Sequence, residues 1–120
     1  MCFIILQIND LQCEDLALVV KITIKSDYAT TDIISLLSKL NRSPWRSERR
    51  SRGGFKLYHI TTEKEGREGN IRLRKTQYTK DGHKRIYATA VGFDEANLTS
   101  KFIKWILTHF RDKTHRITIT

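Results

Sequence analysis

Residues 70–92 read NIRLRKTQYTKDGHKRIYATAVG, a segment in which polar and apolar side chains alternate on both sides of one Asp-Gly pair. Such alternation is typical of strands that bury one face. Asp-Gly is the preferred centre of a two-residue type I′ hairpin turn, because both positions need φ > 0. The segment therefore predicts a β-hairpin that turns at Asp81-Gly82.

A two-residue turn would fix the register of this hairpin. Tyr78 is then expected opposite Arg85, and Arg74 opposite Thr89, and directly opposed residues share a face. The polar face would carry Arg72, Arg74, Thr76, Tyr78, Arg85, Tyr87 and Thr89. The apolar face would carry Ile71, Leu73, Ile86, Ala88 and Ala90, which we expect to form the core.

The flanking sequence predicts the rest of an α+β fold. Further strands are expected at 16–25 and 55–62, amphipathic helices at 30–41 and from Asp94 to Phe110, and an edge strand at 115–120. The order is β-α-β-β-β-α-β, with a three- to five-stranded, mainly antiparallel sheet and two helices packed on one face. Residues 42–54 lack aliphatic periodicity, and an Arg/Ser-rich loop is expected there.

The size and composition indicate one folded domain. The chain has 120 residues, of which 39% are hydrophobic and 29% charged, so we predict a single domain over 1–120 with an apolar extension at 1–15. The apolar run at 1–8 is too short for a membrane span and lacks the features of a signal peptide, so no membrane association is expected. Cys2 and Cys13 are interpreted as free thiols, which favours the cytoplasm, or the nucleus for a eukaryotic or viral chain. A homodimer is left open.

The charge is concentrated in one part of the chain. The net charge is +9, and residues 1–40 carry three lysines and five acidic residues, so residues 41–120 hold a net charge of +11. Such an excess favours association with polyanions. We predict nucleic acid, DNA before RNA, as the first partner and an acidic protein as the second.

The predicted interface has two parts, the polar hairpin face and the arginine loop. Guanidinium groups bind phosphates and base edges, and phenols stack on bases, although a merely solvated sheet face has a similar composition. Trp45 in the loop is interpreted as a packing residue rather than a stacking one. The predicted nucleic-acid-binding residues are Arg46, Arg49, Arg50, Arg52, Arg72, Arg74, Tyr78, Lys84, Arg85 and Tyr87.

Two other functions are kept as alternatives. The first is a nuclease or nucleotide-acting enzyme in which His59 performs acid–base chemistry beside the basic surface. The second is an inhibitor or immunity protein that covers an acidic partner. Glu63, Glu65 and Glu68 are interpreted as a solvated cluster and no zinc-type Cys/His spacing occurs, so neither a metal nor a cofactor is predicted.

Three segments resemble known families. A meander followed by a helix that opens at Gly92-Phe93-Asp94-Glu95-Ala96, over about residues 70–110, is similar to AP2-like domains and to the arm-binding domains of tyrosine recombinases. This resemblance implies a sheet in a DNA major groove, with Arg72, Arg74, Arg85 and Tyr87 against the DNA. The order α-β-β-β-α resembles a double-stranded-RNA-binding domain, whose basic helix start is replaced here by Asp94-Glu95. Leu57-Tyr58-His59 and Ile86-Tyr87-Ala88-Thr89 resemble the paired motifs of small ADP-ribosyltransferases, which implies the enzyme alternative.

Overall fold

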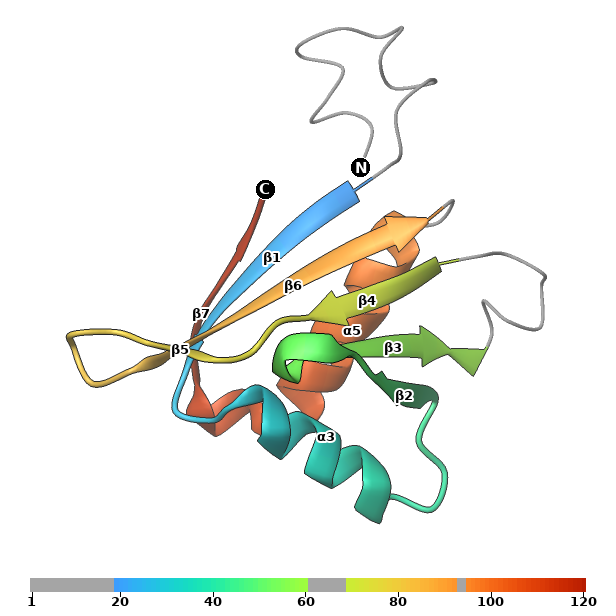
Figure 1. The fold of residues 1–120 in the computed structure, drawn as a ribbon, viewed down its shortest axis with the longest axis horizontal. Coiled ribbons are helices and arrows are strands. Elements are labelled where there is room, and N and C mark those ends of the chain that lie inside the picture. The colour runs from blue at the N-terminus through green and yellow to red at the C-terminus, as the bar shows by residue number, and fades with distance from the viewer. Residues whose placement is uncertain (1–18, 61–68, 93–94) are drawn as a thin grey trace, which may run out of the picture.

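The computed structural model describes residues 19–60, 69–92 and 95–120, which form one antiparallel sheet and two helices (Figure 1). The strands are β1 (Val19–Ser26), β2 (Trp45–Arg49), β3 (Phe55–His59), β4 (Gly69–Leu73), β5 (Gln77–Tyr78), β6 (Lys84–Gly92) and β7 (Thr114–Ile119). The helices are α3 (Thr30–Lys39) and α5 (Glu95–Phe110), and short 3₁₀ turns lie at Ser51–Gly53 and Arg111–Lys113. The predicted α+β class is confirmed, whereas the predicted three to five strands are too few, because the described residues form a seven-stranded sheet.

Some of the predictions concern residues that are not described. Three of them lie outside the described residues: the apolar extension at 1–15 with its two cysteines, the acidic cluster around Glu65, and Asp94 at the predicted start of the second helix. Among the residues that are described, no helix is long and apolar enough to cross a membrane.

The strand order in the sheet is β2-β3-β4-β6-β1-β7, and β5 pairs with the first residues of β6. All pairs are antiparallel, and the nine-residue β6 lies between β4 and β1. The strand predicted at 115–120 is present as β7, which pairs with β1 through Ile24 and Ile117. The sheet therefore brings the C-terminal strand next to the first described strand.

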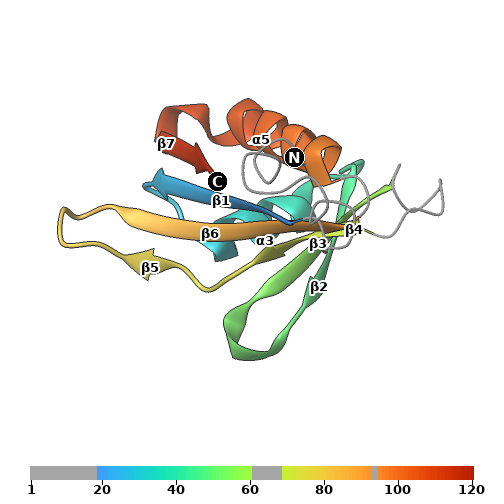
Figure 2. The same cartoon turned by 90° about the horizontal axis from the view of Figure 1, so that it is seen from above.

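The core lies between the sheet and α5, which covers one face of the sheet (Figure 2). Alternate residues of the central strands point toward α5, as the period-two pattern predicts. These are Val20, Ile22 and Ile24 of β1, Ile71 and Leu73 of β4, and Ile86, Ala88 and Ala90 of β6, all at most 3% exposed. α5 supplies Leu98, Phe102 and Ile106 to the same core. α3 lies at the end of the sheet beside the C-terminal end of α5, so the prediction that both helices cover one face is only half right.

The predicted loop at 42–54 contains a strand. β2 pairs along its whole length with β3, and Trp45 is its one buried residue. The Trp45 ring is 4% exposed and its edge meets Phe102 at a centroid distance of 6.0 Å, which confirms the packing interpretation. The sequence pattern did not predict this strand because an edge strand needs few apolar residues. Charged side chains also protect its open edge from pairing with another chain.

The hairpin at 70–92 forms, but its register differs from the prediction. Gln77 lies opposite Arg85, and Tyr78 lies opposite Lys84. The Thr79 N–H donates to the His83 carbonyl at 3.0 Å, so the loop has three residues, 80–82, and Gly82 takes the left-handed conformation with φ 83°. A three-residue loop with glycine in this position is a common hairpin connection, and it shifts every pair by one residue relative to a two-residue turn.

A second shift separates β4 from β5. Arg72 lies opposite Thr89, because the chain leaves the ladder between Arg74 and Thr76 to meet the start of α3. The Thr30 N–H donates to the Thr76 hydroxyl at 2.8 Å, and the Thr30 hydroxyl donates to the Arg74 carbonyl at 2.8 Å. These bonds satisfy polar groups at the helix start, and they remove Thr76 from the predicted polar face.

Candidate nucleic-acid interface

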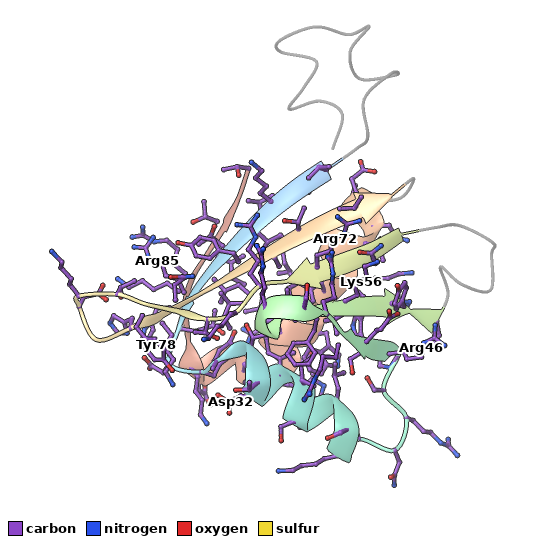
Figure 3. All side chains as sticks on the ribbon, viewed as in Figure 1. Asp32, Arg46, Lys56, Arg72, Tyr78 and Arg85 are labelled. Carbon is purple, nitrogen blue, oxygen red and sulfur yellow. The ribbon has the colours of Figure 1, made fainter. Side chains whose placement is uncertain are left out.

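The sheet face opposite α5 is called the open face, because neither helix covers it (Figure 2). Its side chains alternate with the core residues along every long strand. The cations of the open face are Lys21 and Lys25 of β1, Arg46 of β2, Lys56 of β3, Arg72 of β4, Arg85 of β6 and Arg116 of β7. Figure 3 shows the labelled members of this group, Arg46, Lys56, Arg72 and Arg85, spread across the sheet.

Two rows of directly opposed residues cross the open face. The first row runs from Lys56 through Arg72 and Thr89 to Lys21, over four adjacent strands. The second row runs over β5, β6, β1 and β7 and consists of Gln77, Arg85, Lys25 and Arg116. Like charges directly opposite one another destabilise a sheet. The pairs Lys56/Arg72, Lys25/Arg85 and Lys25/Arg116 therefore have an electrostatic cost for folding.

Two acidic residues of the described part of the chain offset some of this charge. Glu48 lies opposite Lys56 at the edge of the face. Asp81 of the hairpin loop binds the Lys25 ammonium at 2.8 Å, and this hydrogen bond is the main reason that the pKa of Asp81 falls well below its usual range. Asp81 thus stays ionised over the whole neutral range and compensates one of the seven cations.

Two tyrosines lie among these cations. Tyr87 is half-buried on β6 between the two rows, opposite Thr23 of β1. Tyr58 lies opposite Arg46, whose guanidinium carbon is 5.5 Å from the centre of the phenol ring. Guanidinium groups beside aromatic rings supply both anion binding and a stacking surface, which are the two elements of nucleic-acid recognition on a sheet.

Most of the predicted interface residues lie on one side of the molecule. Arg46, Arg72, Arg85 and Tyr87 are on the open face, and the Arg74 N–H donates to the Tyr87 carbonyl at 3.0 Å directly after β4. The β2–β3 connection, which carries Arg50 and Arg52, projects away from α5, on the same side as the open face (Figure 2). Arg49 is the last residue of β2 and lies opposite Phe55, so it alternates to the side of Trp45 and not to the open face.

Tyr78 and Lys84 also lie off the open face. The one-residue shift at the hairpin loop places them opposite each other and turns both to the side that does not carry Arg85. Tyr78 is 75% exposed, and the Lys84 ammonium is 5.8 Å from the centre of its ring. The prediction that Tyr78 and Arg85 share a face is therefore wrong.

The sequence pattern also missed residues that the sheet adds to the interface. Lys21, Lys25 and Thr23 alternate with apolar residues in β1, and Lys56 and Tyr58 do the same in β3. This alternation is visible in the sequence. What it does not show is that β1 and β3 flank the hairpin, so that their polar faces extend the hairpin face in both directions.

His59, the candidate for catalysis, lies in the core. Its side chain is 8% exposed and meets the edge of Trp45 at a centroid distance of 4.8 Å. Burial, followed by the charge of Lys101, lowers the pKa of His59, so the ring is neutral at pH 7. This position keeps the imidazole away from any substrate bound at the open face.

A large groove in the described part of the chain lies on the other side of the molecule. It has a volume of about 1130 Å³ between α5, β1 and β7. Its walls include Val20, Ile103, Leu107 and Ile119, and neither His59 nor an acidic residue lines it. The groove offers apolar contacts and no acid–base pair, so it adds no support for the enzyme alternative.

Comparison with known proteins finds no match to a family model, to a curated protein or to a solved structure.

Proposed function

We propose that this chain is a nucleic-acid-binding protein, with DNA as its first ligand, and that it holds the ligand against the open face without catalysis. The observation that supports this proposal most is the like-charge pairing of Lys56 with Arg72 and of Lys25 with both Arg85 and Arg116. Residues that break a local rule of stability are expected at functional sites. Asp81 is paired with Lys25 and Glu48 lies opposite Lys56, so a phosphate backbone adds negative charge chiefly beside Arg72, Arg85 and Arg116.

The size of the open face fits a short length of nucleic acid. Arg46 on β2 and Arg116 on β7 are separated by five strand spacings, which is roughly 24 Å at about 4.8 Å per spacing. Duplex DNA rises about 3.4 Å per base pair, so this width corresponds to about seven base pairs. The face is therefore wide enough for contacts to several phosphates at once.

The residue types suggest a division of roles. The two rows of cations contact phosphates, which gives affinity that is independent of sequence. Arg72 and Arg85 can form bidentate bonds to a phosphate or to a guanine edge. Tyr87, between the rows, offers a phenol to an unstacked base or a sugar. Arg50 and Arg52 in the β2–β3 connection extend the contact beyond the sheet.

The test compares two double variants that lose the same charge. Arg72→Ala with Arg85→Ala removes one guanidinium from each row, whereas Lys104→Ala with Arg111→Ala removes two cations beside the groove on the α5 side. At about 1.5 kcal/mol for each charged hydrogen bond, the open-face variant is expected to bind roughly 100-fold more weakly. The α5-side variant is expected to stay within about threefold of the wild type.

Binding is measured by fluorescence anisotropy with single- and double-stranded DNA and RNA. Equal losses in the two variants would mean that only net charge matters, and that the open face is not the interface. If the wild-type protein bound none of the four nucleic acids but did bind an acidic protein, the proposal would be overturned in favour of the inhibitor alternative.

A further inference from the structure

Three segments that are distant in the sequence place Asp27, His83 and His115 together. Asp27 follows β1, His83 precedes β6, and His115 lies in β7. The His83 Nδ1 atom is 3.0 Å from one carboxylate oxygen of Asp27, and the His115 Nε2 atom is 2.8 Å from the other. The two imidazole centroids are 4.4 Å apart, and the three donor atoms all lie within 4.8 Å of one another.

The sheet fixes the backbone beside all three residues, and His115 lies at an irregularity in the β1–β7 register. Ser26 pairs with Lys84 on β6 and with Thr114 on β7, so the residues beside the cluster are fixed by the ladder. The Asp27 N–H donates to the Lys113 carbonyl at 2.9 Å, which ties the end of β1 to the start of β7. The cluster therefore needs only side-chain rotation to change its geometry.

Two imidazoles and one carboxylate form a ligand set for a divalent transition metal. Zn²⁺ binds histidine nitrogen and carboxylate oxygen at about 2.0–2.2 Å, so neighbouring ligand atoms around a tetrahedral ion lie about 3.4 Å apart. The distances of 3.0 and 2.8 Å are shorter than this value, whereas the separation among the three donor atoms reaches up to 4.8 Å, so binding needs side-chain rotations that even out these distances. The side chains are 31% to 49% exposed, so an ion can enter and water can complete its coordination.

We propose that Asp27, His83 and His115 bind one divalent transition-metal ion, with Zn²⁺ as the probe. The sequence predicted no metal site because His83 and His115 lie 56 and 88 residues after Asp27, and the three residues match no metal-binding motif. Bound metal links β1, the β5–β6 hairpin and β7 at one point. Imidazole ligands favour zinc-like ions over Mg²⁺ and Ca²⁺, which prefer all-oxygen sites.

The experiment uses the metal-free full chain carrying Cys2→Ser and Cys13→Ser, so that no thiolate can bind the probe. Isothermal titration with ZnCl₂ is expected to give a stoichiometry of one ion per chain. The midpoint temperature of thermal unfolding is expected to rise by several degrees when Zn²⁺ is added. Co²⁺ is expected to give the visible absorption of a site with nitrogen and oxygen ligands. MgCl₂ is expected to change nothing.

Ligand variants test the assignment. His83→Ala and His115→Ala are each expected to weaken Zn²⁺ binding at least tenfold, and His109→Ala, which changes an exposed histidine of α5 outside the cluster, is expected to bind like the parent. Asp27→Asn keeps a hydrogen-bonding side chain of the same shape but loses the charge, and it is expected to weaken binding to a similar extent. Absence of zinc binding in the parent, or equal weakening by His109→Ala, would overturn the proposal.

Discussion

Ile86→Asp is expected to cause the largest loss of stability. The Ile86 side chain is fully buried in β6 and belongs to the face that packs against α5. A carboxylate at this position would lose its hydration without gaining a partner, which costs about 4 kcal/mol or more. Because small domains are stable by about 5–15 kcal/mol, this loss is a large part of the total. Circular dichroism during urea denaturation measures it.

Thr89→Asp is the matched control for this prediction. Thr89 lies on the same strand but on the open face, opposite Lys21 and Arg72. The same carboxylate therefore gains two cationic neighbours, and we expect a change in unfolding free energy of less than about 1 kcal/mol. If Ile86→Asp folded as well as Thr89→Asp, the division of β6 into a core face and an open face would be wrong.

Phe102→Ala is expected to cause the second largest loss. The Phe102 ring is fully buried in α5 and meets the edge of Trp45 from β2, so it joins the helix to the edge of the sheet. Truncation of a buried phenylalanine leaves a cavity and costs about 3–5 kcal/mol. The unfolding midpoint in urea is expected to fall while the slope of the transition is unchanged.

Tyr87→Ala provides the comparison for Phe102→Ala. It removes a ring of similar size from the open face, where the ring is half-buried, and we expect a smaller loss of about 1 kcal/mol. Similar losses in the two variants would contradict the docking of α5 against the sheet through Phe102.

Local patterns were enough to predict the hairpin, the core side of β6 and the two helices. The alternation of Ile86, Ala88 and Ala90 with Arg85, Tyr87 and Thr89 identified both faces of β6. The register of the hairpin could not be predicted from these patterns, because it depends on the loop length that the Thr79–His83 hydrogen bond sets. One residue of difference was enough to turn Tyr78 away from Arg85.

The extent of the candidate interface depends on tertiary structure. No local signal places β1 between β6 and β7, yet this order brings Lys25 against Arg85 and Arg116. The same order gathers Asp27, His83 and His115 at one end of the sheet. Strand order is set by packing over the whole core, so these clusters appear only when the fold is known.

A salt titration of DNA binding tests the proposed function most directly. If the open face contacts about five phosphates, the logarithm of the binding constant should fall linearly with the logarithm of the salt concentration, with a slope of about −4.5. Affinity for a short DNA duplex should then drop roughly 500-fold between 50 and 200 mM NaCl. A slope near zero, or no binding to DNA at 50 mM NaCl, would contradict the proposal that the open face binds a phosphate backbone.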